Sequence, residues 1–336
     1  MKRLFFVTVL VIFAGIGFIL LWLQYDMDKQ LHQPMTLDKE EVLVIEPGIS
    51  LSAISRELVG RGWLEHPYYL VFAGRRENKA TRIKTGEYAV EPGTTPLELL
   101  DKLISGKVIQ YPLTIPEGLT SQQFIALVQT HPQLKKTLTD DDPKKVMEAL
   151  GHPGQNAEGR FYPDTYYFPR GATDVEFLQR AYHTMETILA QEWQRRDVGL
   201  PYKDPYEALI MASIIEKETA VPEERGKIAG VFVRRLLKGM KLQTDPTIIY
   251  ALGNSYDGNI RRKDLSFDSP YNTYVYAGLP PTPIACPGRD AIRAALQPED
   301  GTELYFVARG DGSHHFSSTL AEHNRAVAKY QLNRHQ

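Results

Sequence analysis

The sequence predicts an α+β protein with a single N-terminal transmembrane helix, and three patterns lead to this prediction. Residues 4–23 form an uncharged apolar run. Residues 41–118 alternate strand-like and helix-like segments divided by Gly and Pro, and residues 158–336 combine a strongly apolar helical pattern with a strand-like segment at 304–308. With 336 residues, the chain is long enough for an anchor and at least two folded parts.

The apolar run has about the 20 residues that a helix needs to cross a bilayer core. A cleaved signal peptide is the alternative, but it would have a shorter apolar region and a small-residue cleavage site, whereas Trp22 and polar residues follow this run. Lys2 and Arg3 precede the run, so the positive-inside rule keeps residues 1–3 in the cytoplasm and exports the rest. The polar, irregular pattern of residues 24–40 predicts a short tether.

Composition argues against several kinds of function. The 39 basic and 41 acidic residues include no basic block long enough to follow a phosphate backbone, so nucleic acid is not an expected partner. Cys286 is the single cysteine, and we expect a small packed residue rather than a nucleophile. His314, His315 and His323 match no compact ligand spacing, so we expect no metal.

A weak repeat of strand, tight turn and helix occurs three times. The predicted strands are 42–45, 87–90 and 111–115, and each leads through a Gly- and Pro-containing turn into a helical pattern. Thr95 and Ser121 stand where helix caps are expected. These units, over residues 41–118, resemble small LysM-like β/α modules that hold N-acetylated glycan strands, although a repeated scaffold without a ligand would give the same pattern.

Chemistry is expected at the end of a helix. Asp204 followed by Pro205 has the form of a helix start, and the apolar residues that follow almost all round predict a buried helix. Two carboxylates, Glu216 and Glu218, come at its end. On this helix Glu218 continues the more apolar face, whereas Glu216 lies over smaller and more polar residues.

Partial burial of Glu218 would raise its pKa, because desolvation disfavours the charged form of a carboxyl group. A carboxyl that keeps its proton near neutral pH is suited to donate it to a glycosidic oxygen, and a shift from about 4.3 to 6 or 7 needs only a few kcal/mol. The residues alone support an alternative to the proton-donor role equally well. Both glutamates could form surface ion pairs with Lys217, Arg225 or Lys227 at the end of a structural helix.

The segment IIEKETA at 214–220 and other motifs, in matching order, resemble the YceG-like family of endolytic murein transglycosylases. These motifs are KTGEY at 84–88, EG at 158–159, YPDTY at 162–166, LQTDPT at 242–247, YNTY at 271–274, GLPP at 278–281, HF at 315–316 and EHN at 322–324. With the apolar N-terminal run, the resemblance covers nearly the whole chain. The cysteine in the loop 283–288 departs from the expected pattern and concerns only local packing.

The helical, charged pattern of residues 119–157 predicts a connecting part, and the alternation of helices and strand predicts an α+β catalytic domain over 158–336. For that domain the resemblance implies a lysozyme-like site helix. It implies that Glu218 protonates the glycosidic oxygen between N-acetylmuramic acid and N-acetylglucosamine. Glu218 then takes the proton of the muramic C6 hydroxyl, which attacks C1 and leaves a 1,6-anhydro end. Because the nucleophile belongs to the same sugar, no metal or organic cofactor is implied.

Other residues are expected to support the site or to bind sugar. They are Glu216, Gln243, Asp245, Tyr271, Asn272, Tyr274 and His315. Asp245 could instead cap the next helix, and loops rich in Asn and Tyr also arise simply as turns. The expected partners are peptidoglycan glycan strands, peptidoglycan synthases and the bilayer through residues 4–23. The expected location is the inner membrane with a periplasmic catalytic domain. The alternative function is a non-catalytic peptidoglycan-binding scaffold.

Overall fold

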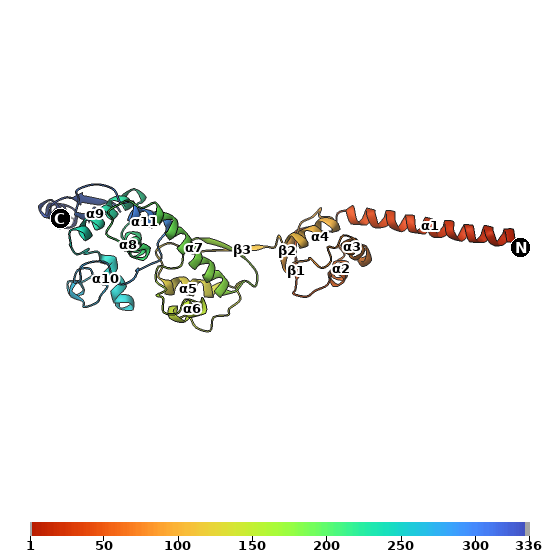
Figure 1. Ribbon diagram of the computed structural model, residues 1–336, viewed down its shortest axis with the longest axis horizontal. Helices are drawn as coiled ribbons and strands as arrows, with labels where there is room; N and C mark the ends of the chain where they lie inside the picture. Colours follow the sequence, from red (N-terminus) through yellow and green to blue (C-terminus); the bar gives the residue numbers. More distant parts are fainter. Residues whose placement is uncertain (1, 333–336) are drawn as a thin grey trace. The chain divides into compact units, whose positions relative to one another are not determined.

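A computed structural model describes residues 2–332, which fall into two compact units (Figure 1). The first unit runs up to Tyr111 and includes Phe168–Arg170, and the second begins at Pro112. We expected boundaries at 118 and 157; the chain passes from the first unit to the second between Tyr111 and Pro112, and Phe168–Arg170 alone returns to the first unit. The segment that we expected to be a connecting subdomain belongs to the second unit because it shares that unit's core. For example, the rings of Phe124 and Phe161 lie 5.3 Å apart.

The first unit begins with α1 (Lys2–His32). The stretch Phe5–His32 is long and apolar enough to cross a membrane, and an 18-residue window of it has a mean hydropathy of 2.7. The irregular tether that we expected over 24–40 is helical as far as His32. The reason lies in packing, since Leu31 and Met35 are buried in the core of this unit and α1 contacts its helices α3 and α4.

Two antiparallel strands and three helices complete the first unit. Strand β1 (Glu41–Ile45) pairs with β2 (Gly86–Val90), and α2 (Leu51–Gly60) and α3 (Pro67–Arg76) lie between them in the sequence, with α4 (Pro96–Ser105) after them. The inward side chains of the strands, such as Leu43 and Tyr88, are fully buried against the apolar faces of the helices. The predicted strands at 42–45 and 87–90 are therefore confirmed.

The strand, turn and helix repeat is present, with its third copy in the second unit. Each turn contains a glycine in the left-handed region, where residues with a Cβ are strained: Gly48, Gly93 and Gly118, with φ of 80°, 92° and 79°. Thr95 caps its helix through a capping box, as expected. The third helix is capped by Thr120 and not by Ser121, because the Thr120 hydroxyl accepts the N–H of Gln123.

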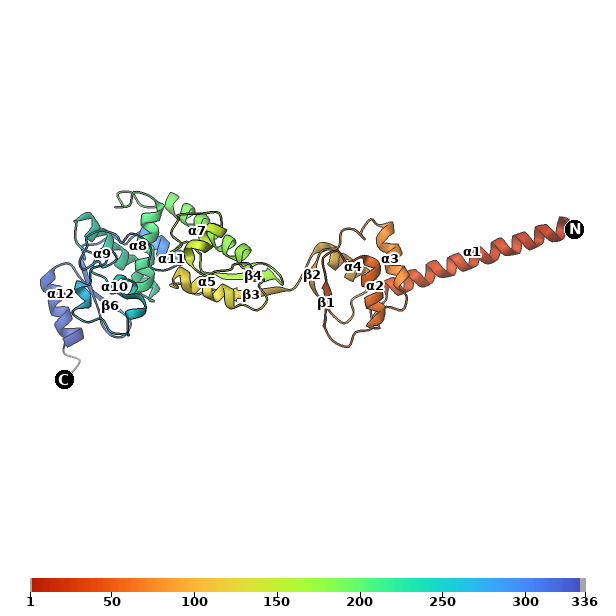
Figure 2. The ribbon, with the colours of Figure 1, turned by 90° about the horizontal axis from the view of Figure 1, so that it is seen from below.

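The second unit contains most residues of a two-stranded sheet, whose strands β3 (Gln110–Thr114) and β4 (Thr165–Pro169) lie side by side in Figure 2. Its remaining elements are α5 (Ser121–Thr130), α6 (Pro143–Ala149), α7 (Asp174–Gln194), α8 (Pro205–Glu218), η1 (Pro222–Glu224), α9 (Arg225–Leu237), α10 (Asp245–Leu252), η2 (Gly253–Ser255), η3 (Asp264–Ser266), α11 (Arg289–Leu296), β5 (Tyr305–Ala308), β6 (His314–Ser317), α12 (Leu320–Val327) and the π-helical η4 (Ala328–Leu332). The expected mixture of helix and sheet is confirmed.

Helix α8 lies at the centre of the second unit, where it packs against α7, α9, α10 and α11 (Figure 1). Every residue from Ala208 to Ile215 is buried. Asp204 caps the helix by accepting the N–H of Glu207 at 3.0 Å, as the sequence predicts. Because each fully buried Leu or Ile contributes about 1.5–3 kcal/mol, the helix is firmly held and fixes the position of its last residue, Glu218.

The loop before α11 packs closely beside this core. Cys286 is fully buried, its N–H donates to Leu119 O at 2.7 Å, and burial raises the pKa of its thiol. A thiol with a raised pKa is a poor nucleophile at neutral pH. Cys286 is therefore a packed residue, as expected.

Candidate active site

Glu218 lines a cavity of about 530 Å³ within the second unit. The helix ends directly after it, because Thr219 has an extended backbone with φ −142° and ψ 136°. Further segments supply the walls: α9, the loop leading into α10 with the first residue of that helix, the loop that carries Tyr274, the β5–β6 hairpin, α12 and η4. Their lining residues include Arg235, Leu242, Gln243, Thr244, Asp245, Tyr274, Tyr305, Phe306, His314, Leu320, His323 and Asn324.

The Glu218 carboxyl group has one close partner. The hydroxyl of Thr244 donates to Glu218 Oε2 at 2.6 Å. Within residues 2–332, no Lys, Arg or His lies within ion-pair distance of this carboxylate. Burial raises the pKa of Glu218 to about 7, while the Thr244 hydrogen bond opposes the rise. The Asp245 charge raises the pKa further, and His314 lowers it. A group with this pKa exchanges a proton readily at neutral pH.

Glu216 has different surroundings, although only Lys217 separates it from Glu218. It accepts the backbone N–H of Gly288 at 3.0 Å and lies 3.8 Å from the Arg225 guanidinium. Burial raises its pKa, and the Gly288 hydrogen bond opposes the rise. Its side chain does not line the Glu218 cavity. The ion-pair alternative therefore applies to Glu216 and not to Glu218.

Asp245 and Tyr274 face the cavity together, as expected for support residues. The Tyr274 hydroxyl donates to Asp245 Oδ1 at 2.8 Å, and burial followed by the Asp245 charge raises the pKa of the phenol. The alternative, in which Asp245 caps the helix, does not apply, because Thr244 occupies the cap position and Asp245 is the first helical residue. The carboxylate of Asp245 is therefore available to the cavity.

Gln243 also lines the cavity, and its backbone is strained. Its φ is +54°, in the left-handed region that residues other than glycine rarely adopt. The Gln243 N–H donates to Thr273 O at 3.2 Å, and Arg235 Nη1 donates to Gln243 Oε1 at 3.3 Å. Strain of this kind is commonly found at functional sites, where the surrounding contacts hold it in place.

Two of the expected sugar-binding residues lie elsewhere. Asn272 is fully buried, where it donates to Phe267 O at 2.8 Å and accepts the N–H of Tyr274 at 3.0 Å. Tyr271 packs its ring 4.9 Å from that of Tyr250 and shares a hydrogen bond of 2.8 Å with Thr282. Asn272 therefore shapes the loop that presents Tyr274, and neither residue lines the Glu218 cavity.

His314 and His323 line the cavity, whereas His315, the histidine expected at the site, does not. Alternate side chains of a strand point to opposite faces, so neighbouring residues of β6 diverge. His314 Nδ1 lies 2.7 Å from Glu224 Oε2, and the His314 backbone N–H donates to Glu224 Oε1 at 2.9 Å. His315 instead lies with its ring 5.6 Å from that of Tyr330.

Several cavity residues were not among the predicted site residues. Thr244 and Asn324 stand within quoted motifs, so their motifs offered a way to find them, whereas Arg235 and Tyr305 carry no comparable pattern. Arg235 is held by the carbonyls of its own neighbourhood, including Leu304 O at 2.6 Å. Its position depends on packing between α9 and β5 that the sequence does not display.

Comparison with known proteins identifies the family of the chain. Residues 43–329 match the YceG-like family, which is most of the chain. The chain belongs to the YceG-like family. Since the match includes both α8 and the loop with Thr244 and Asp245, the cavity lies inside the region that defines the family.

Members of the YceG-like family with curated names resemble the chain along most of its length. An endolytic murein transglycosylase of Bacillus subtilis (strain 168) is 33% identical over 328 residues, covering 90% of this chain and 88% of that protein. A protein of the same name from Streptococcus pneumoniae serotype 2 is 28% identical over 343 residues, covering 91% of this chain and 61% of that protein. A crystal structure of a yceG-like protein from Listeria monocytogenes has a TM-score of 0.54 and 32% identity, covering 86% of this chain and 99% of that chain.

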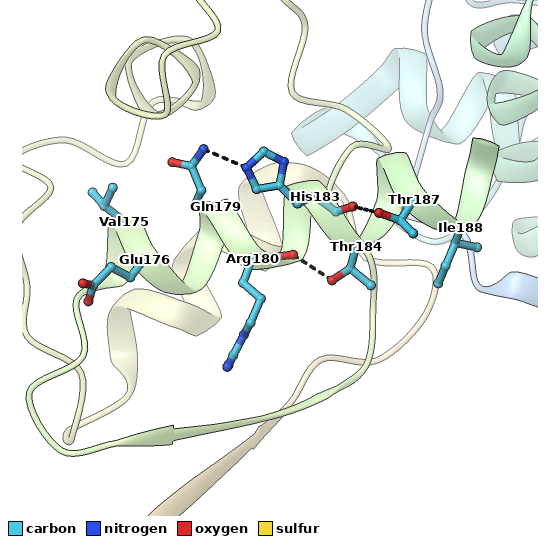
Figure 3. A pocket seen from close by; sticks show the side chains of 8 residues that line it. All are labelled: Val175, Glu176, Gln179, Arg180, His183, Thr184, Thr187 and Ile188. Atoms are coloured by element: carbon cyan, nitrogen blue, oxygen red, sulfur yellow. Dashed lines mark hydrogen bonds between the residues drawn. The ribbon is translucent and has the colours of Figure 1, made fainter. Parts of the chain in front are cut away.

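Another hollow of this YceG-like chain, of about 540 Å³, lies along α7 (Figure 3). All of the side chains drawn there come from that one helix. Two of the hydroxyls donate to backbone carbonyls of the same helix, Thr184 to Arg180 O at 2.7 Å and Thr187 to His183 O at 2.8 Å. None of the eight residues drawn is a buried acid. The proton chemistry therefore belongs to the Glu218 cavity.

Proposed function

We propose that this chain is an endolytic murein transglycosylase. It is a lyase that cleaves the β-1,4 bond between N-acetylmuramic acid and N-acetylglucosamine and leaves 1,6-anhydromuramic ends. The observation that carries this proposal is Glu218, a carboxyl group with a pKa of about 7 in a cavity of about 530 Å³. The names of the Bacillus subtilis and Streptococcus pneumoniae relatives support it.

In the first half of the reaction, protonated Glu218 donates its proton to the glycosidic oxygen as the bond from that oxygen to muramic C1 breaks. The leaving N-acetylglucosamine keeps this proton as its 4-hydroxyl. In the second half, the muramic C6 oxygen forms a bond to C1, and its proton returns to the Glu218 carboxylate. No water is consumed, and the enzyme ends in its starting protonation state.

The residues around Glu218 suit this sequence of steps. Thr244 holds the carboxyl group through the 2.6 Å hydrogen bond, which limits its rotation. The negative charge of Asp245 raises the pKa of Glu218 and would stabilise the positive charge that develops at C1. Because Glu224 engages Nδ1 of His314, Nε2 is the His314 nitrogen left for the cavity or the substrate.

Glycan binding by the first unit is part of the proposal. Two antiparallel strands with two helices between them in the sequence, β1-α2-α3-β2, are compatible with a LysM-like module.

We assign residues 4–23 of α1 to the bilayer of the inner membrane, with the N-terminus cytoplasmic and the catalytic domain periplasmic. An enzyme tethered in this way would act on nascent strands beside peptidoglycan synthases and end their elongation.

Product analysis tests the activity. The full chain in detergent micelles is incubated with uncrosslinked glycan strands, and the products are separated and weighed by mass spectrometry. The proposal predicts strands shortened from within that carry anhydromuramic ends, which are lighter by one water than ordinary reducing ends. Reducing ends would indicate a hydrolase. Strand binding without any shortening would favour the non-catalytic scaffold.

A further inference from the structure

A pocket of about 500 Å³ adjoins the same two helix ends that form the Glu218 cavity. Helix α8 contributes Glu218 to the cavity and Lys217 to this pocket. Helix α10 contributes Asp245 to the cavity and Pro246, with further residues, to the pocket. Because neighbouring residues of a helix diverge by about 100°, one helix end can serve two separate spaces. We call this space the Lys217 pocket.

Hydrogen bonds hold the inner wall of the Lys217 pocket in place. Glu158 is buried there, and its carboxylate accepts three hydrogen bonds: from Ser121 N at 2.8 Å, from Ser121 Oγ at 3.3 Å and from Tyr250 OH at 3.0 Å. Burial raises the pKa of Glu158, and these donors oppose the rise. With its oxygens engaged in this way, Glu158 acts as a fixed part of the wall.

The rim of the pocket carries unused donors. Lys217 Nζ donates to the carbonyl of Gly118 at 3.1 Å, and in the part of the chain that the structure describes it has no carboxylate partner. The side-chain amide NH2 groups of Asn254 and Gln123 likewise donate no hydrogen bond to an acceptor among residues 2–332. Beside them lie the apolar side chains of Pro246 and Ile249.

An ammonium, free amide donors and an apolar wall suit an extended ligand that carries amides and carboxylates. In a strand that carries its peptides the lactyl carboxyl group of muramic acid is an amide, so the sugar backbone offers no anionic partner for the ammonium, whereas a short peptide with acidic residues offers one. In murein such a peptide branches from the muramic acid ring. A muramic acid held at Glu218 would therefore carry its peptide close to Lys217, the adjacent residue of α8.

We propose that the Lys217 pocket binds the stem peptide of the muramic acid whose bond Glu218 cleaves. The inference rests on the proposed transglycosylase activity and names the form of substrate that the enzyme prefers. Lys217 pairs with a peptide carboxylate, Asn254 and Gln123 donate to peptide carbonyls, and Ile249 and Pro246 contact apolar side chains. Contacts to the branch hold the muramic acid in register with Glu218.

The test compares two substrates of equal strand length, one carrying its stem peptides and one from which an amidase has removed them, which leaves only the lactyl carboxylate on each muramic acid. The full chain in detergent is assayed on each, and kcat/KM is obtained from the anhydromuramic ends formed. The measured quantity is the ratio of the two kcat/KM values. We expect the wild-type ratio to be about ten in favour of the peptide-bearing strand, which corresponds to one charge-assisted hydrogen bond.

Lys217→Met, which keeps the apolar stem of the side chain but removes its charge, should bring the ratio close to one. Lys217→Arg should keep most of the preference. Lys203→Met is the matched control, because Lys203 is an exposed lysine of the same unit that lies outside both spaces. It should leave the ratio at the wild-type value.

A wild-type ratio of one or less would overturn the inference while leaving the activity in place. A preference that survives in Lys217→Met would also overturn it, because another part of the chain would then recognise the peptide. If Lys217→Met lowers kcat/KM equally on both substrates, the lysine acts on Glu218 or on the fold, and the inference fails. Failure of the wild-type chain to cut either strand would refute the activity and, with it, this inference.

Discussion

The regions around Glu158, which is buried, and Glu218, which is partly buried, differ in what they do with a carboxyl group. Burial raises the pKa of both. Glu158 receives three hydrogen bonds from two residues that belong to α5 and α10, so it joins these elements. Glu218 receives one, from Thr244, and its remaining surroundings open to a cavity.

The difference shows that burial alone does not identify a catalytic acid. A buried carboxylate whose oxygens are occupied by fixed donors stabilises the fold and has no capacity left for a substrate. A carboxyl group with a single partner, in a cavity large enough for sugar, can pass its proton to a ligand. The predictions that follow separate these two uses, from the largest expected effect to the smallest.

The largest effect is expected for Glu218→Gln. An amide keeps the shape of the side chain but cannot cycle a proton, so strand cleavage should fall by about 10²–10⁴-fold. Production of anhydromuramic ends by the purified full chain measures the loss. Glu216→Gln is the matched control on the same helix, and it should retain most of the activity because Glu216 does not line the cavity. Equal loss in both variants would remove the distinction between the two carboxylates.

The same substitution should change how stability depends on pH. Unfolded Glu218 titrates near its ordinary value of 4.5, and folded Glu218 titrates at about 7. Between these values the folded chain keeps a proton that the unfolded chain has released. The free energy of unfolding therefore falls as pH rises from about 4.5 to about 7, by roughly 3 kcal/mol in total.

Glu218→Gln removes this pH-dependent contribution to the free energy of unfolding. Relative to the wild type, the variant should be more stable at pH 8 than at pH 4, as measured by urea denaturation monitored through tryptophan fluorescence. An unchanged difference between the two proteins across this pH range would show that Glu218 is not desolvated in the folded state.

Glu158→Ala should destabilise the fold, in contrast to the Glu218 variant. It leaves the N–H of Ser121 and the hydroxyl of Tyr250 without their acceptor, which costs about 1–3 kcal/mol. Urea denaturation at pH 7 measures this loss. Glu158→Gln retains a carbonyl oxygen as acceptor and should lose less. A stability of Glu158→Ala equal to that of the wild type would contradict the structural role.

The smallest effect is expected for Thr244→Val. Its hydroxyl stabilises the charged form of Glu218, so its removal raises the pKa of Glu218. Because the reaction starts from protonated Glu218, activity should fall as pH rises through that pKa. In the variant, this fall should move to higher pH by about one unit or less. Profiles of kcat/KM between pH 5 and 9 measure it, and a shift to lower pH would contradict the assigned role.

Local patterns in the sequence were enough to predict the elements, and contacts between distant segments decided what could not be predicted. The start of α8 follows from Asp204 and Pro205, and its burial follows from its apolar residues. Prediction failed where tertiary packing intervened. The helix α1 extends to His32 because Leu31 packs on the first unit, and this contact has no local sequence pattern.

Within the site, helical geometry favoured Glu218 over Glu216, and only the family resemblance decided between a catalytic role and an ion pair, whereas the partners of Glu218 were not predicted. Neighbouring histidines on β6 could not be told apart without knowing which face of the strand meets the cavity. Asn272 was expected to bind sugar, but its amide is used up by backbone groups of its own loop. A sequence shows which residues are polar. It does not show which way their side chains point, or whether their hydrogen bonds are already made within the fold.

The most direct test of this account is the titration of Glu218 itself. In the full chain in detergent micelles, selectively labelled with ¹³C at glutamate carboxyl groups, the Glu218 signal is assigned by its absence from Glu218→Gln. The account predicts a titration midpoint at about 7. A midpoint near the ordinary value of 4.5 would show a carboxylate that is fully ionised at neutral pH, and would contradict its role as the proton donor.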